Sequence, residues 1–374
     1  MSKAAIIAAL EGRSLDRLPI QILTYDGYYA RCAGRKQWEF DYGTIAGQLE
    51  MQLAAIRRHP QVDAWWTWTG MNRGPQPGVR INVVDGDPFA VYEDGRRLPL
   101  ADFHGMFDRS PEEHRLVLDR YRVKHQAEIE DKCGPVVNAD ELLARLPGYS
   151  VLRRLADQVG EEKFLWFNQS SLFASASTYL GGIEEAWIQS AENSALVEAI
   201  LDYLLLLHLE YIEAGARAGG HGVWNCFMNE GANILSPETW RRLVKPRVAR
   251  IVERSHQLGL KHVAWFLDDC RELVADLIEI GVDGIATEQP RGHYYCDPGE
   301  LRRRAGDSNL CIFGWFLEED LLKGNREAAG NTLRNQWMEA GGGKPFVVNT
   351  PGLTQEYDPY VIDMVIEESL RLTG

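Results

Sequence analysis

The sequence predicts an α/β protein that folds as a single (β/α)8, or TIM, barrel. Two observations predict this fold. The chain has 374 residues, which is enough for one large barrel. Eight short strand-like runs alternate with longer helical patterns, and this alternation is typical of βαβ units with a parallel sheet. We therefore expect one domain that spans residues 1–374.

The expected strands are short apolar runs, at 18–23, 63–68, 164–167, 222–226, 262–266, 284–286, 310–313 and 346–348. Helical patterns lie between most of them, for example at 183–214, 237–258 and 272–280. The last pattern ends at Gly281, a residue that suits the turn after a helix.

One stretch interrupts this alternation. Residues 79–100 alternate apolar and polar side chains around Asp-Gly pairs, which is the pattern of a β-hairpin. Residues 103–162 are helical and acidic in pattern, with breaks at Pro135 and Pro147. We expect an insertion of about residues 75–162 after the second strand, with its hairpin across one mouth of the barrel. A second domain in this region stays open, although no linker marks its edges.

Composition excludes several classes of protein. The net charge of −14 argues against nucleic acid or an anionic membrane as a partner, because both require a cationic surface. No signal peptide or long apolar run is recognisable. The six cysteines are scattered without CxxC spacing, which favours free thiols in a cytoplasmic protein.

Acidic residues follow several of the expected strands, whose carboxyl ends meet at the mouth where such barrels hold their sites. The candidate catalytic residues are Asp26, Glu230, Asp268 and Glu288, with His293 on the loop after the sixth strand. Structural alternatives stay open. Asp268 or Asp269 would cap the helix that begins near Arg271, and Glu288 would pair with Arg291.

A metal site is a further hypothesis. Zinc accepts thiolate and carboxylate ligands, so Cys270, Glu230 and Glu288 are candidate ligands. Acids crowded at one mouth would raise each other's pKa unless a cation or a bound proton compensated them. The alternative is that Cys270 is a small buried apolar residue. His262 and His221 lie at the starts of their strands, where structural roles are expected.

Aromatic and amide side chains also gather near strand ends. Trp65, Trp66 and Trp68 alternate along the second strand, so two of them share a face. The candidate substrate-binding aromatic residues are Tyr25, Trp68, Trp265 and Trp315, which would line an apolar pocket for a flat ring. Amides that could orient a substrate are Asn168, Gln169, Asn225, Asn229 and Asn349.

Several segments, in this order and spacing, resemble the uroporphyrinogen decarboxylase superfamily. They are ALEGRSLDRLPIQ (9–21), NILSPETWRRLVKPRVARIV (233–252), LIEIGVDGIATEQP (277–290), LCIFG (310–314) and PFVVNTPG (345–352). The resemblance covers nearly the whole chain and implies a (β/α)8 barrel with its site at the carboxyl ends of the strands. The superfamily contains decarboxylases and zinc-dependent methyltransferases that exchange methyl groups with a corrinoid (cobalamin-type) cofactor.

The chain departs from both groups. The arginine-rich segment of the decarboxylases is replaced by LTYDGYYARCAGR (23–35), which retains Arg31 and Arg35 but places Asp26 at the strand end, so porphyrin decarboxylation is not expected. The His-x-Cys of the methyltransferases would fall at His262 and Ala264, and their second cysteine at Thr350 or Gly352. Zinc is therefore either missing or held by a rearranged set of ligands.

The resemblance implies a methyltransferase, closer to the corrinoid-linked branch than to the decarboxylases. It would move a methyl group between a small substrate, such as a methoxylated aromatic that undergoes O-demethylation, and a corrinoid on a separate protein docked at the mouth. Two rivals stay open: a lyase that acts on a small aromatic acid through Asp26 and Arg31 or Arg35, and a non-catalytic barrel that binds a corrinoid or tetrapyrrole. A homodimer also stays open.

Overall fold

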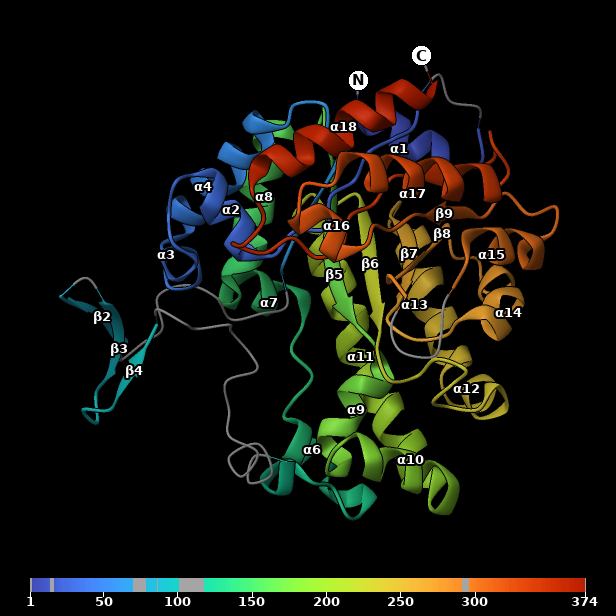
Figure 1. Ribbon diagram of the computed structural model, residues 1–374. Helices are drawn as coiled ribbons and strands as arrows, with labels where there is room; N and C mark the ends of the chain where they lie inside the picture. Colours follow the sequence, from blue (N-terminus) through green and yellow to red (C-terminus); the bar gives the residue numbers. More distant parts are fainter. Residues whose placement is uncertain are drawn as a thin grey trace.

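Seven parallel strands form the main sheet of the computed structural model, which describes residues 2–13, 17–69, 79–85, 87–100, 118–290 and 296–373 (Figure 1). In spatial order they are β1 (Ala64–Thr67), β5 (Phe164–Ser170), β6 (Gly222–Phe227), β7 (Lys261–Phe266), β8 (Gly284–Thr287), β9 (Cys311–Phe313) and β10 (Phe346–Val347). Because their spatial order follows the chain order, helices connect neighbouring strands around the outside of a curled sheet. The predicted α/β class with a parallel sheet is confirmed.

The first expected strand, at 18–23, occurs as isolated bridges between the two edge strands. Ile20 bridges Val348, next to β10, and Gln21 bridges Ala64 of β1. A continuous strand does not form here because two backbone N–H groups are not available to bond a neighbouring strand. Pro19 has no N–H group, and the N–H of Ile20 donates to the Asp63 carboxylate at 2.8 Å. This segment therefore contacts both edges of the sheet without forming a continuous strand.

Helices surround this sheet. Helix α1 (Ser2–Leu10) packs against the amino ends of its strands. Four helices pack on the strands themselves: α8 (Pro147–Val159), α11 (Ser194–Arg217), α13 (Lys245–Gln257) and α15 (Pro298–Ala305). The other helices pack around these or at the ends of the sheet: α2 (Asp26–Cys32), α3 (Gln37–Asp41), α4 (Ile45–Arg58), α9 (Leu172–Leu180), α10 (Ile183–Glu192), α12 (Pro237–Leu243), α14 (Val274–Glu279), α16 (Glu318–Leu322), α17 (Arg326–Glu339) and α18 (Pro359–Thr373). Two patterns that predict single helices are each split, at Asn193 and Val244, and a proline near the start of α13 contributes to the second break.

The side chains of the strands alternate between two cores. The larger core lies between the sheet and its helices and includes Trp65, which packs near Tyr29. The second core, which we call the interior cluster, fills the inside of the curled sheet. Its large rings are Trp66, Phe164, Trp166, Trp224, Trp265 and Phe313. Helix α1 closes this cluster at the amino ends of the strands with Ile6, Ala9 and Leu10.

Residues 79–100 form the expected hairpin with a third strand added. Strands β2 (Val79–Val84), β3 (Asp87–Tyr92) and β4 (Arg97–Pro99) make a separate antiparallel sheet. The helices α6 (Ile129–Cys133) and α7 (Ala139–Arg145) follow in the expected helical region, and Pro147 begins α8. The position of the hairpin across the barrel mouth stays a prediction, as does the single-domain assignment.

Two further findings concern the whole described chain. All six cysteines are free in the structure. Among the described helices, none combines the length and hydrophobicity that a membrane crossing requires.

The Asp63 carboxylate ties the bridging segment to the sheet, and this contact generates a test. Asp63 is fully buried and accepts hydrogen bonds from Ile20 N (2.8 Å) and from the Arg17 guanidinium (2.5 and 2.7 Å). Asp63→Ala leaves these donors without their acceptor, so it should lower the free energy of unfolding in urea by about 2–3 kcal/mol. Asp94→Ala, which removes an exposed pair with Arg96, is the control and should leave the urea midpoint unchanged. An unchanged midpoint for Asp63→Ala would show that the segment is held by other contacts.

Candidate active site

Three of the predicted carboxylates meet around one thiol at the carboxyl ends of β6, β7 and β8. Cys226 lies near the end of β6. Burial raises the pKa of its thiol well above the usual range, and the charges of Glu288, Glu230 and Asp268 raise it further. We call these four residues the acidic cluster. Sequence reasoning missed Cys226, although its even spacing from Trp224 along the strand places it on the inner face.

Glu230 is the most deeply buried acid of the cluster. Its side chain is 0% exposed, and neither carboxylate oxygen has a hydrogen-bond partner in the described part of the structure. Burial raises its pKa to about 8, an effect that Asp268 strengthens and the nearby Ser171 hydroxyl weakens. Near neutral pH, Glu230 therefore holds a proton much more readily than an ordinary glutamate does.

The loop after β6 folds tightly against the end of β7, and this contact brings Glu230 and Asp268 together. Asn229 adopts a left-handed backbone conformation with φ of 63°. At Gly231, a Cβ atom would lie 2.4 Å from the Cβ of Asp268, so only glycine fits there. The N–H of Glu230 donates to the Asp268 carboxylate at 3.3 Å. Burial raises the pKa of Asp268, although the backbone N–H groups of this loop oppose the shift.

The neighbouring Asp269 is the acid that serves the following helical turn. Its carboxylate accepts hydrogen bonds from the N–H of Arg271 at 2.9 Å and from the guanidinium of Arg271 at 2.6 Å. Although burial raises the pKa of Asp269, these bonds lower it overall. Asp269 thus holds Arg271 at the start of this turn, whose N-cap residue is Cys270, and Asp268 remains at the mouth of the sheet.

Cys270 does not join the acidic cluster. It is fully buried in the outer core, and contact with Cys296 is the largest of the causes that raise its pKa. In the ranges that the structure describes, no three His, Cys, Asp or Glu side chains are arranged to hold a metal ion. The predicted ligand set of Cys270, Glu230 and Glu288 therefore does not fit zinc. His293 lies outside the described residues.

An aromatic surface lies beside the acidic cluster. The rings of Tyr25 and Trp68 stack with centroids 5.6 Å apart. Trp66 continues the row, 4.2 Å from Trp68 and 6.1 Å from Trp265. Trp265 is the β7 partner of Cys226 in the parallel ladder. We call the row of Tyr25, Trp68, Trp66 and Trp265 the aromatic surface, although only Tyr25 and Trp68 are partly exposed and Trp66 and Trp265 are buried. The row ends beside Cys226 of the acidic cluster.

The packing of the Tyr25 ring requires glycine at position 352. A Cβ atom there would lie 2.1 Å from the Tyr25 ring. A cysteine at position 352, one of the two candidates for the missing distal ligand, would therefore displace the Tyr25 ring.

The other predicted side chains make structural contacts at the same end of the sheet. Asn168 accepts a hydrogen bond from Thr69 N at 2.8 Å, and Asn349 accepts one from the Gln21 side chain at 3.1 Å. The backbone of Trp315 forms two bonds with the Gln336 side chain. These contacts hold the strand ends in place.

Asp26 and two of the predicted amides are buried. Asp26 is buried in the first turn of α2, directly after Tyr25. The amide groups of Gln169 and Asn225 are buried, and they bond the His208 ring and the Gln169 carbonyl, respectively. The side chains of Gln169 and Asn225 alternate with the inward-facing Asn168 and Trp224, so they face away from the mouth.

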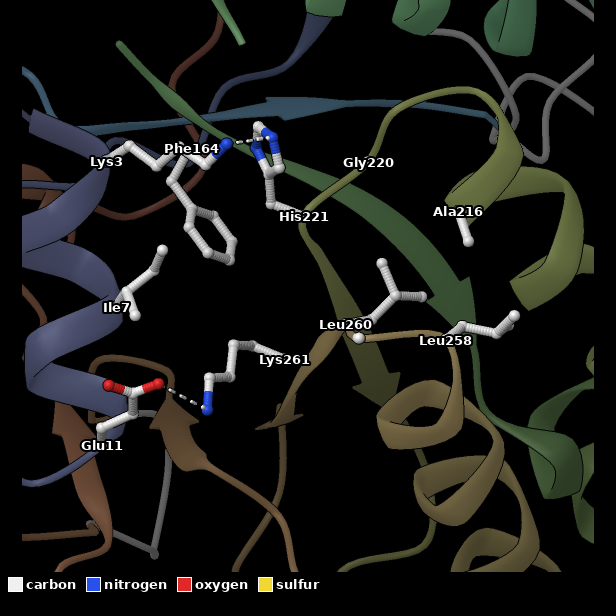
Figure 2. Close-up of a pocket in the computed structure, with 11 residues that line it drawn as sticks. Lys3, Ile7, Glu11, Phe164, Ala216, Gly220, His221, Leu258, Leu260 and Lys261 are labelled. Atoms are coloured by element: carbon white, nitrogen blue, oxygen red, sulfur yellow. Dashed lines mark hydrogen bonds and ion pairs between the residues drawn. The ribbon is translucent and has the colours of Figure 1, made fainter. Parts of the chain in front are cut away.

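A pocket of 330 Å³ lies at the opposite end of the sheet (Figure 2). There Lys3 of α1 donates to the Gly160 carbonyl at 2.9 Å and contacts His221 at 2.8 Å, while Lys261 pairs with Glu11 at 3.6 Å. Burial, with Lys3, lowers the pKa of His221 to about 4. These charged groups compensate each other at the amino ends of the strands, where barrels keep residues for stability. His221 thus lies at the amino ends of the strands, as predicted.

His262 likewise has a structural role. It begins β7, is fully buried, and its Nδ1 lies 3.1 Å from the Ser255 hydroxyl. Burial lowers its pKa to about 3.

The buried carboxyl group of Glu230 should make stability depend on pH. Its pKa is about 8 in the folded chain against 4.5 as the reference value, so the folded state holds a proton that the unfolded state has released between these values. Stability is then lost as the pH rises from about 4.5 to 8, by at most about 1.4 kcal/mol per pH unit. Glu230→Gln should flatten this slope in urea denaturation at pH 5 to 8, whereas the exposed Glu319→Gln should keep it. Parallel curves for Glu230→Gln and the wild type would rule out a raised pKa.

Comparison with solved structures finds a similar fold along the whole chain. A methyltransferase from Methanosarcina mazei matches with a TM-score of 0.70 and 14% identity, over 100% of this chain and 99% of that chain. Ribulose-1,5-bisphosphate carboxylase/oxygenase from Pyrococcus horikoshii OT3 (TM-score 0.38, 11% identity, 94% and 59% of the two chains) and D-psicose 3-epimerase from Clostridium cellulolyticum H10 (0.33, 13%, 67% and 92%) are too distant to bear on function.

Comparison of sequences gives the family. No curated protein matches the chain. The family model for uroporphyrinogen decarboxylase (URO-D) matches residues 137–369, which is more than half of the chain. The matched region includes the acidic cluster and β5 to β10. The expected family is thus confirmed, and the chain belongs to the uroporphyrinogen decarboxylase family.

Proposed function

We propose that this protein is a methyltransferase that moves a methyl group between a small substrate and a corrinoid carried by a separate protein at the open mouth of the barrel. The observation that carries the proposal is the aromatic surface that leads into an acidic cluster. Such a mouth suits an uncharged or cationic methyl donor and would repel a substrate rich in carboxylates. The likeness in fold to a methyltransferase agrees with this proposal.

The position of the two remaining arginines argues against the decarboxylase alternatives. The Arg31 side chain is 47% exposed and pairs with Asp358 at 3.7 Å. The Arg35 side chain is 57% exposed and pairs with Glu39 at 3.1 Å. Both cations face solvent, so neither would meet the carboxylates of a porphyrin or a small aromatic acid at the mouth, where the described charged groups of the cluster are acids. This charge distribution disfavours the lyase and favours methyl transfer.

The side chains of the protein would bind the methyl donor and orient it toward the corrinoid. The aromatic surface would hold the methyl donor, and Asp268, fixed by the N–H of Glu230, would keep the loop after β6 in place. A reduced corrinoid supplies a strongly nucleophilic metal centre that accepts a methyl group. Zinc has no part in this scheme, because Cys270, one of the three candidate ligands, lies in the outer core apart from Glu230 and Glu288. A non-catalytic carrier is the remaining rival.

Two structural proposals accompany the function. Ile20 and Gln21 bridge opposite edges of the sheet. These bridges support a closed barrel in which the 18–23 segment takes the place of the eighth strand. The free state of all six cysteines supports a reducing compartment, and hence a cytoplasmic protein.

Methyl transfer to free cob(I)alamin tests the proposal. The protein should methylate the corrinoid from a panel of small methylated compounds, followed by the change in corrinoid absorbance. Trp265→Ala removes a ring from the aromatic surface and should lower kcat/KM by about tenfold or more, equivalent to about 1.4 kcal/mol. Glu319→Gln, on exposed α16, should keep the wild-type rate.

Other products would identify a rival function. Release of carbon dioxide from small aromatic acids without methyl transfer would establish the lyase. Tight binding of a corrinoid or tetrapyrrole without turnover of any compound would establish the carrier.

A further inference from the structure

We propose that Cys296 and Cys270 form a peroxide-sensitive modification site between the loops that follow β7 and β8, in which Cys296 is oxidised first and Cys270 then closes a disulfide. Both residues belong to the outer core, apart from the acidic cluster. The inference does not depend on the proposed function, because methyl transfer leaves this pair of thiols unused.

The fold brings the two thiols together from separate segments. Cys270 is the N-cap residue of the 3-10 turn η2 (Arg271–Leu273), which follows β7. Cys296 directly precedes Asp297, the N-cap residue of α15. Helix α15 packs against this turn, and the two thiols form a hydrogen bond with each other. Thiols in such contact need only a small movement to reach the S–S bonding distance of about 2 Å.

The surroundings of Cys296 favour its reactive form. All six cysteines lie in the described ranges, and Cys296 is the one whose pKa is lowered. The hydrogen bond with Cys270 is the largest cause, and the charge of Arg271 contributes, although burial and Asp269 oppose the shift. Because the thiolate is the nucleophilic form, Cys296 would react before its partner.

A contact with Asp269 distinguishes this pair from thiols that only fill space. The Sγ of Cys296 lies 3.8 Å from the Asp269 carboxylate, to which the thiol donates. The same carboxylate accepts from the Arg271 guanidinium at 2.6 Å. A cysteine that serves only as a small apolar residue needs no carboxylate or guanidinium beside it.

Burial restricts the oxidant to a small molecule. Cys296 is 3% exposed, and Cys270 is 0% exposed. Hydrogen peroxide is little larger than water, whereas glutathione disulfide needs room for a whole peptide beside the attacking sulfur. We therefore expect hydrogen peroxide to oxidise the site and glutathione disulfide to leave it reduced.

The reaction has two steps, with hydrogen peroxide as the oxidant. The Cys296 thiolate attacks one oxygen, so that an S–O bond forms while the O–O bond breaks, and the second oxygen leaves as hydroxide and takes up a proton. The Cys270 sulfur then attacks the sulfenic acid. The S–S bond forms, the S–O bond breaks, and the departing hydroxide leaves as water with the Cys270 proton. Each sulfur loses one electron to the peroxide, and a thiol reductant reverses the reaction.

The disulfide would join the loop after β7 to the start of α15. Asp268 lies two residues before Cys270, and its carboxylate accepts from the N–H of Glu230 in the loop after β6. Oxidation would therefore stiffen a segment that carries one of the acids of the mouth. Disulfides in a reducing compartment are usually transient, which suits a redox-sensitive site.

Thiol counting on the full-length protein tests the site. The reduced protein receives one equivalent of hydrogen peroxide, is unfolded in urea and is titrated with Ellman's reagent. The count should fall from six to four, and dithiothreitol should restore it. Peptide mapping without reductant should find one cross-link, between Cys270 and Cys296. Cys133→Ser, which changes a cysteine on α6, is the matched control and should form the same cross-link.

Single variants separate the roles of the two thiols. Cys270→Ser should leave a sulfenic acid at Cys296 that dimedone traps, and Cys296→Ser should keep its remaining cysteines reduced. Six free thiols in the peroxide-treated wild type, or a cross-link between other cysteines, would refute the site whether or not either variant folds. Equally fast oxidation by glutathione disulfide would contradict the restriction to small oxidants.

Discussion

Tryptophan rings lie in contact inside the curled parallel sheet, with Trp166 and Trp224 at 5.4 Å and Trp224 and Trp265 at 6.2 Å between centroids. This packing determines where chemistry can occur. Because the rings fill the interior and α1 closes it at the amino ends of the strands, the described residues leave the carboxyl ends of the strands as the place where a substrate would bind. The loops after β6, β7 and β8 end at that mouth, and each contributes one carboxylate there. The filled interior also keeps water away from Glu230.

The low dielectric of this interior raises the pKa of the buried acids Glu230 and Asp268. In solvent, three carboxylates and a thiol at such positions would interact weakly. Glu230 is buried, and no lysine or arginine of the described chain is among the groups that shift its pKa. Its charged form is therefore unfavourable, and a proton compensates it. The same family fold can thus take a different substrate. The arginines that would attract an acidic substrate face solvent, and the mouth presents rings and carboxylates instead.

Much of this arrangement could be predicted from the sequence because strand order places residues at one end of a parallel sheet. That rule brought Glu230, Asp268 and Glu288 to one mouth, and period-two alternation placed Trp66 inside and Trp65 outside. Local sequence patterns did not predict where the side chains of the loops point. Asp268 and Asp269 are equivalent in sequence, and only the fold shows which of them binds Arg271. Cys270 was expected at the mouth, but the turn after β7 directs it into the outer core beside Cys296. The bridging role of 18–23 depends on Asp63, a contact across 43 residues that no local pattern reveals.

The central claim is that Glu230 is a buried acid without a positively charged partner among the residues that the structure describes. Infrared difference spectroscopy of the protonated carboxyl group measures this directly, with Glu230→Gln as the reference spectrum. The account predicts a protonated carboxyl band in the wild type at pH 6 that disappears with a midpoint near pH 8, matching the pKa of about 8. A Glu230 that is already ionised at pH 6 in the ligand-free protein would contradict the account.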